Sequence, residues 1–437
     1  MLKSLSLSLL GLLGLSLNLG GASSPQITEL LAWQEVAFFQ LPAEPDPAAE
    51  KIVDNYLNRL AARGLAADAQ GVWLQSGMTR LATRNGTIPD SAASLTKIAT
   101  TLAAVKTWGL DHRFETEVLI QGTVNNGVLQ GDLVIQGGGD PFFVWEEAIA
   151  LGNALNQLGI REVTGNLLVT GEFYMNYKTN PQTAGQLLKL ALDSQQWTPV
   201  VLKQYNKMPP ETKRPQIKIQ GQVVTQGNIA AAKPLMRRQS MTLANILKQM
   251  NIFSNNVMAE TLAEAAGGAD RVSQLAAQAA EVSPDEIQLI NGSGLGVANR
   301  ISPHAAISMF MALERELDTQ SWGVGDLFPV SGRDKQGTME DRNFPPHTVL
   351  KTGTLRGVSA LAGVVPTRDR GLVWFALVNE GGDIVELRSQ QDRLLQDIAN
   401  TWGITTLPNK GGTGLDEKLG DPSRNFTQEI GSKAPSF

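Results

Sequence analysis

The sequence predicts an α+β protein in which helices flank a mostly antiparallel sheet that is interrupted by a smaller β-rich body. Apolar residues recur at the three- and four-residue spacing of helices in both halves of the chain. Short β-branched runs bounded by turn residues occur near both ends of that pattern and between its halves. A chain of 437 residues usually exceeds what a single hydrophobic core organises. We therefore expect two compact bodies, or one body with a large insertion.

The first part of the chain predicts a helix, a strand pair and a second helix. Residues 28–64 have helical spacing, interrupted by prolines. Residues 71–74 and 79–83 are expected to pair around a turn at Ser76 and Gly77. The next helix is predicted to begin near Ser94 and to continue through Val105.

The composition changes beyond Leu110, and we expect residues 115–238 to form an inserted domain. Residues 116–120 and 133–135 predict a β-hairpin around the Asn125-Asn126-Gly127 turn. The remainder predicts a helix at 146–158, a strand pair within 162–170 and a polar stretch with few strands at 176–239.

Helical spacing then returns, followed by strands and a last helix. The expected helices are 242–250, 256–266, 271–279, 303–316 and 385–402, and the expected strands are 348–351, 359–365 and 372–378. After Thr405 large apolar residues almost disappear, so residues 405–437 are predicted to be a disordered tail. The main domain would therefore comprise residues 23–114 and 239–404.

The N-terminus resembles an export signal. One lysine, Lys3, precedes a Leu/Ser/Gly run over 4–19, and small residues follow at 20–22. We expect residues 1–22 to be a signal peptide and the mature protein to be periplasmic or secreted, with at most peripheral membrane association. A buried N-terminal helix or a retained membrane anchor is the alternative.

Composition excludes several classes of function. The formal charge is −5 and no dense Lys/Arg run is present, so nucleic acid is not an expected partner. The chain has no cysteine and only three histidines, without a His-Glu-x-x-His string, so we expect no metal site. Gly137 to Gly139 are not followed by Gly-Lys-Ser/Thr, and we expect no nucleotide or other cofactor.

Three short strings together describe a serine acyl-transfer site. In Ser94-Leu95-Thr96-Lys97 a helix would place the amine of Lys97 beside the hydroxyl of Ser94, which needs a proton acceptor to become a nucleophile. The lysine can act as a base if burial, or a neighbouring charge such as Lys351, lowers its pKa. Taken alone, the string is more typical of a solvated helix face than of an active site.

The second string, Ser254-Asn255-Asn256, supplies a hydroxyl to relay a proton to the leaving amine and a carboxamide for the substrate peptide bond. A polar helix cap is the structural alternative. In the third string, Lys351 adds positive charge, and the hydroxyls of Thr352 and Thr354 can bind a carboxylate. Gly353 would let substrate backbone approach the strand. Backbone N–H groups of Ser94 and Thr354 are candidates for the oxyanion hole.

The order of the strings matches the signature of serine β-lactamases and penicillin-binding proteins, with Asn255 in place of the usual Asp. Their surroundings resemble the class C low-molecular-mass penicillin-binding proteins, the D-alanyl-D-alanine carboxypeptidase/endopeptidase family, over about residues 50–400. The stretches that show this resemblance are 94–100, 137–141, 291–295 and 351–363.

The resemblance implies a serine β-lactamase/transpeptidase-like domain with an inserted β-rich domain. It implies a penicillin-binding enzyme, inhibited by β-lactam antibiotics, that acts on the D-Ala-D-Ala end or cross-link of peptidoglycan stem peptides. The catalytic residues would be Ser94, Lys97, Ser254, Asn256 and Lys351, and the substrate-binding residues Thr352, Gly353 and Thr354. Asn291, Gly296 and Val297 depart from the family pattern.

Two further residues are candidates for substrate contacts, and each has an alternative interpretation. Asp140 is a candidate for binding an ammonium group on the third residue of the stem peptide, and a turn-forming Asp-Pro is the alternative. Arg356 either contacts an acidic group of the substrate or lies in solvent. For the whole protein the alternatives are a secreted serine β-lactamase and a non-catalytic cell-wall-binding protein of the same fold.

Overall fold

The computed structural model describes residues 45–407, 410 and 417–427. The predicted signal peptide and the first part of the predicted helical segment, up to residue 44, lie outside these residues. Within the described ranges, no helix combines the length and apolar character that a membrane span requires.

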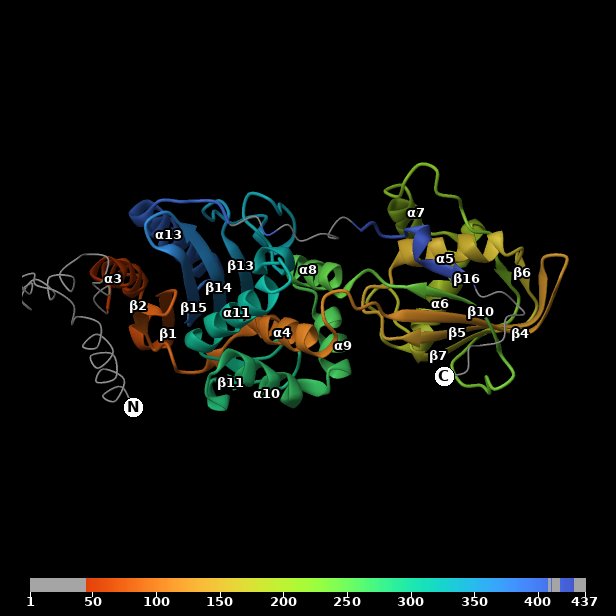
Figure 1. Cartoon of the computed structure of the whole chain (residues 1–437), viewed down its shortest axis with the longest axis horizontal. Helices are drawn as coiled ribbons and strands as arrows, with labels where there is room; N and C mark the ends of the chain where they lie inside the picture. The colour runs from red at the N-terminus through yellow and green to blue at the C-terminus, as the bar shows by residue number, and fades with distance from the viewer. Residues whose placement is uncertain (1–44, 408–409, 411–416, 428–437) are drawn as a thin grey trace, which may run out of the picture. The chain divides into compact units, whose positions relative to one another are not determined.

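A five-stranded antiparallel sheet forms the first body, in the order β13-β14-β15-β1-β2 (Figure 1). The predicted strand pair at 71–83 is confirmed, and β1 also pairs with β15, about 300 residues later in the chain. The strands are β1 Gln70–Ser76, β2 Thr79–Arg84, β13 Val349–Leu355, β14 Val358–Thr367 and β15 Gly371–Glu380. Strand β13, which contains the third string, lies at the edge of the sheet.

Alternating residues of the central strands face two different cores. Leu361 and Phe375 pack with α3 (Pro47–Ala61) and α13 (Ile384–Trp402). Ala362 and Trp374 lie on the opposite face, in the core that contains α11 (Pro303–Asp318). This period of two is what a sheet covered on both faces requires.

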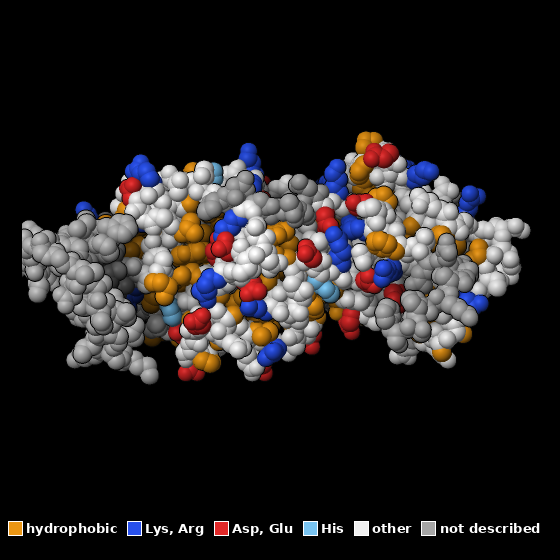
Figure 2. All heavy atoms as spheres, viewed as in Figure 1, with side chains coloured by type: hydrophobic (Ala, Val, Ile, Leu, Met, Phe, Trp, Pro, Cys, Tyr) orange, Lys and Arg blue, Asp and Glu red, His pale blue; other side chains and the backbone are white. Residues whose placement is uncertain are grey.

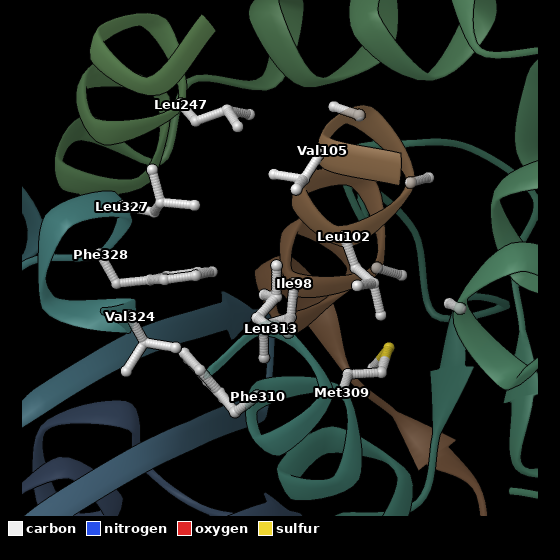
Figure 3. Close-up of a cluster of buried hydrophobic side chains, with 14 of the residues drawn as sticks. Ile98, Leu102, Val105, Leu247, Met309, Phe310, Leu313, Val324, Leu327 and Phe328 are labelled. Atoms are coloured by element: carbon white, nitrogen blue, oxygen red, sulfur yellow. The ribbon is translucent and has the colours of Figure 1, made fainter. Parts of the chain in front are cut away.

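The larger core surrounds α4 (Thr96–Trp108), the helix that follows the first string. Figure 3 shows Ile98 and Leu102 of α4 among side chains of α11, including Met309 and Leu313. The other predicted helices of this body are confirmed as α8 Leu243–Phe253, α9 Asn256–Ala265 and α10 Gly268–Ala280, and a short helix α12 spans Val324–Leu327.

A small sheet lies next to the first string. Its order is β11-β12-β3, and its strands are β3 Asp90–Ser91, β11 Ile287–Gln288 and β12 Arg300–Ile301. Because β3 ends three residues before Ser94, this sheet anchors the chain on the N-terminal side of Ser94.

The segment predicted to be an insertion forms a second sheet with its own buried core. Its main order is β16-β10-β4-β5-β6-β8, with β7 paired to β5 and β9 to β7. The strands are β4 Glu115–Asn125, β5 Val128–Gly138, β6 Glu162–Val163, β7 Leu167–Glu172, β8 Lys218–Ile219, β9 Val223–Val224, β10 Lys233–Gln239 and β16 Asn425–Thr427. The predicted hairpin is β4 and β5, and the predicted helix is α5, Trp145–Gln157.

Two expectations for this segment are wrong. Strands β6 and β7 do not pair with each other, because each lies parallel to β5. The polar stretch after residue 176 contains two helices, α6 (Pro181–Leu192) and α7 (Pro199–Tyr205). Both begin with proline at the first turn, where the missing N–H costs nothing, so each carries a local indication of a helix start.

The predicted disorder of the tail is wrong for residues 417–427. Strand β16 pairs with β10, and the preceding 3₁₀ turn, Pro422–Arg424, places Arg424 in a buried ion pair with Glu147. The carboxylate of Glu147 also accepts from Arg238. Composition alone cannot reveal such ordering, because the pairing of β16 with β10 and the ion pair of Arg424 hold this segment in place of apolar contacts.

On the face of the molecule that Figure 2 shows, basic and acidic side chains are interspersed.

Candidate active site

Ser94 lies in a 3₁₀ turn, Ala93–Leu95, and α4 begins at Thr96, two residues later than predicted. The turn is tightly enclosed. A Cβ atom on Gly353 of β13 would lie 2.8 Å from the carbonyl oxygen of Ala92 and 3.1 Å from the nitrogen of Ser94. Gly294, at φ +81°, would place one 1.8 Å from the carbonyl oxygen of Ala93. Both glycines therefore permit close approach to the backbone around Ser94. That Gly353 also makes room for substrate backbone stays a prediction.

Lys97 is fully buried one turn after Ser94, and its Nζ atom has three oxygen partners. It lies 3.0 Å from Ser94 Oγ, 2.8 Å from Asn256 Oδ1 and 2.7 Å from the carbonyl oxygen of Ser293. A neutral amine has two N–H donors and one lone pair. Because carbonyl oxygens only accept, they take the two donors and leave the lone pair to face the hydroxyl of Ser94.

The second string lies between two helices. Ser254 ends α8 in the left-handed conformation, with φ 51° and ψ 42°. Asn255 then caps α9, with its side chain accepting from the backbone N–H of Met258. Asn and Asp are equally good caps, which explains why Asn255 can replace the usual Asp. Asn256 follows as the first residue of α9 and is exposed.

Lys351 joins the second and third strings. Its Nζ atom donates to Ser254 Oγ at 2.9 Å and to the carbonyl oxygen of Thr352 at 2.9 Å. The structure therefore forms two Lys-Ser pairs, Lys97 with Ser94 and Lys351 with Ser254, from segments up to 257 residues apart in sequence.

Burial sets the protonation of both lysines. It lowers the pKa of Lys97 to about 7, against the opposing effect of the Glu260 charge. Burial also lowers the pKa of Lys351 well below its ordinary value, and the charge of Lys97 lowers it further. Burial is therefore the larger cause of the shift in both lysines, and repulsion between the two amines adds to it.

The third string presents two hydroxyls with different surroundings. Thr352 is buried, whereas Thr354 is exposed and accepts from Arg388 Nη2 of α13 at 2.8 Å. Arg356 is exposed in the turn after β13. The arginine that reaches this string is therefore Arg388, which lies 34 residues from Thr354 and which the string gave no reason to select.

Asp140 lies in a different environment from the three strings. Its Oδ1 atom accepts from the backbone N–H of Phe142 at 2.8 Å, as in the turn-forming alternative. Burial and then the charge of Glu147 raise its pKa to about 7, while Arg424 and Arg238 oppose that shift. Its neighbours are thus the buried charges of the second body.

Sequence reasoning also missed the residues that support Lys97. The loop 291–294 provides the Ser293 carbonyl, and Glu260 accepts from the N–H groups of Gly292 and Ser293 at 2.9 and 3.2 Å. The spacing held a clue, because Glu260 follows Asn256 by four residues and therefore lies on the same face of α9.

The model of the D-Ala-D-Ala carboxypeptidase 3 (S13) family matches residues 54–183 and 208–400. The chain is also similar to carboxypeptidase DacB of Mycolicibacterium smegmatis, with 30% identity over 159 residues, which cover 32% of this chain and 34% of the relative. The match therefore spans about a third of that relative's length.

Solved structures show the same fold. The predatory peptidoglycan endopeptidase Bd3459 of Bdellovibrio bacteriovorus has a TM-score of 0.67 and 21% identity, covering 83% of this chain and 100% of that one. Its penicillin G-acylated form, in complex with the immunity protein Bd3460, has a TM-score of 0.66 and 22% identity, covering 82% and 99%. The predicted α+β fold is confirmed.

Proposed function

The chain belongs to the D-Ala-D-Ala carboxypeptidase 3 (S13) family, and we propose that it is a serine-type D-Ala-D-Ala carboxypeptidase and endopeptidase. Its substrates would be peptidoglycan stem peptides, and β-lactam antibiotics would acylate it at Ser94. The observation that supports this most strongly is the 3.0 Å contact between Ser94 Oγ and the amine of Lys97, whose pKa burial lowers to about 7.

The first chemical step follows from that contact. Lys97 takes the proton of Ser94 as the oxygen attacks the carbonyl carbon of the penultimate D-Ala. Backbone N–H groups of Ser94 and Thr354 are our candidates for stabilising the oxyanion that forms. Thr352 and Thr354 would bind the terminal carboxylate, beside the amine of Lys351.

The second lysine pair serves the leaving group. Ser254 is the hydroxyl through which a proton passes to the departing D-Ala nitrogen, and Lys351 contacts that hydroxyl at 2.9 Å. Water then cleaves the Ser94 ester and releases the shortened peptide. In a β-lactam the leaving nitrogen remains tethered in the same molecule, so the acyl-enzyme persists.

We also propose that the protein works outside the cytoplasm, as a periplasmic or secreted enzyme. The export-like sequence at 1–22 and a substrate in the cell wall support this location. Residues 115–238 are proposed to be an inserted domain, because they contain the strands of a separate sheet except β16.

Intact-mass spectrometry after penicillin treatment tests the assignment. The wild type should gain one penicilloyl group, Ser94→Ala should gain none, and the wild type should release D-Ala from a pentapeptide ending in D-Ala-D-Ala. Rapid loss of the adduct with turnover of penicillin would identify a β-lactamase instead. No adduct and no D-Ala would identify a wall-binding protein without catalysis.

Lys97→Ala tests the assigned base. Acylation should fall by about 10²- to 10⁴-fold, because only proton transfer is lost. Circular dichroism should show the wild-type fold. Acylation at the wild-type rate would place the base elsewhere.

A further inference from the structure

Glu260 binds two consecutive backbone N–H groups of the loop that faces Lys97. Its Oε2 atom accepts from Gly292 at 2.9 Å and its Oε1 atom from Ser293 at 3.2 Å. Both carboxylate oxygens are used, so the direction of the loop backbone is determined as well as its distance.

The same peptide segment is held from a second helix. Thr100 of α4 donates to the carbonyl oxygen of Gly292 at 2.7 Å. The loop lies directly on α9, because a Cβ atom on Gly292 would come within 2.7 Å of the carbonyl oxygen of Ala259. Two helices therefore clamp the loop beside Lys97.

The clamp has a chemical consequence at Ser293. Its carbonyl oxygen is one of the two pure acceptors that occupy the N–H groups of neutral Lys97. If this carbonyl moved, an N–H group of Lys97 would be free to rotate toward Ser94, and the lone pair would turn away from the proton that it must accept.

We propose that Glu260 is a positioning residue, which holds the Ser293 carbonyl against Lys97 so that the amine's lone pair faces Ser94. The inference rests on the proposed function, because it assigns Lys97 as the base. Asn256 and Glu260, one turn apart on α9, then position both acceptors of the amine from a single helix.

The charge of Glu260 provides a readout that packing alone would not change. The titratable groups that face Lys97 are Glu260 from α9 and Lys351 from β13, and the charge of Glu260 raises the pKa of Lys97. The negative charge favours protonated Lys97, so its removal lowers the pH at which the amine becomes neutral.

The test is the rate of acylation by a fluorescent penicillin between about pH 5 and pH 9. In Glu260→Gln the plateau rate should fall about tenfold to a hundredfold through misplacement of the amine. The acid limb should move down by about one pH unit. Glu264→Gln, an exposed acid one turn further along α9, should match the wild type in both respects.

The variant Glu260→Asp separates the effect of the negative charge from the effect of side-chain length. It keeps the negative charge but shortens the side chain, so the plateau rate should fall while the acid limb stays at its wild-type position. If Glu260→Gln does not fold, this variant decides, and an unchanged plateau rate overturns the inference.

The outcomes distinguish this inference from the proposed function. A wild-type protein that penicillin does not acylate refutes the proposed function, and the inference with it. A wild type that is acylated, together with a Glu260→Gln variant whose plateau rate matches the wild type, refutes the inference alone, even if its acid limb has moved.

Discussion

Lys97 and Lys351 are chemically identical residues with different partners. Both are fully buried and each contacts a serine hydroxyl, but only Lys97 has two carbonyl oxygens that fill its donors. Burial favours the neutral form of an amine over its charged form. The number of oxygen atoms that accept from the amine then decides where its lone pair points. The two buried lysines of this site therefore differ by single acceptor atoms.

Acylation should depend on pH through Lys97. Its pKa is lowered by burial to about 7, so the amine is neutral above that pH and protonated below it. Because only the neutral form accepts a proton, the acylation rate should fall about tenfold for each pH unit on the acid side. Stopped-flow acylation with penicillin measures this profile, and a rate independent of pH down to about pH 5 would contradict it.

Ser254 combines a functional hydroxyl with an unfavourable backbone conformation. Ser254→Ala and Ser254→Gly both remove the hydroxyl, so both should release D-Ala about 10² to 10⁴ times more slowly. Only glycine relieves the left-handed backbone at φ 51°, so the Gly variant should be more stable than the Ala variant by roughly 1 kcal/mol. Chemical denaturation compares them, and an Ala variant of equal stability would show that the backbone is unstrained.

At the scale of elements, the nucleophile is positioned by a sheet edge and a loop. Strand β13 lies at the edge of its sheet, and its Gly353 touches the 3₁₀ turn that contains Ser94. The loop that contains Gly294 lies against the carbonyl group of Ala93. Ser94 is thus held by neighbours from two segments, and a methyl group at either contact would displace it.

Gly353→Ala tests this arrangement. The added methyl group would lie 2.8 Å from the Ala92 carbonyl oxygen, so acylation should fall about a hundredfold through a small shift of Ser94. The loss of stability should be about 1–3 kcal/mol. Gly325→Ala is the control, since its methyl group meets only contacts of 3.4 Å or longer. Wild-type acylation in Gly353→Ala would exclude the close approach.

At the scale of the molecule, a buried charge cluster attaches the C-terminal segment to the second sheet. Glu147 of α5 accepts from Arg424 at 2.7 Å and from Arg238 of β10 at 2.8 Å, and each of the three residues is nearly inaccessible to solvent. Burial raises the pKa of Glu147, but the two arginines outweigh that effect and lower it overall. The carboxylate is the shared partner of both cations.

Glu147→Gln should therefore destabilise the protein by about 3–5 kcal/mol, because it leaves two buried guanidinium groups without a negative partner. Denaturation followed by circular dichroism measures the loss, and acylation of Ser94 in the folded variant should be unchanged. Arg368→Ala, which breaks the exposed pair with Asp369, should have no measurable effect on stability. Equal effects of the two changes would contradict a structural role for the cluster.

Much of the fold could be predicted, because the local sequence patterns favour the same helices and strands that pack in the tertiary structure. The hairpin at Asn125 to Gly127 and the helix after Ser94 follow from turn residues and apolar spacing. Helix α6 has a start signal in the proline of its first turn, although it lies in a polar stretch. Strand β16 has no such local signal, because its segment is held by contacts such as that between Gly420 and Glu147, 273 residues apart. Arg388 and Glu260 were missed for the same reason: their partners lie in other segments.

The sequence by itself determined the chemical groups, because serine and lysine three residues apart on a helix must lie together whatever surrounds them. Only the tertiary structure decided what those groups can do. The pKa of Lys97 depends on exclusion of water by the whole core, and its orientation depends on oxygens from Asn256 and Ser293. Burial and convergence are properties of the packed chain, because each arises from contacts between residues far apart in sequence.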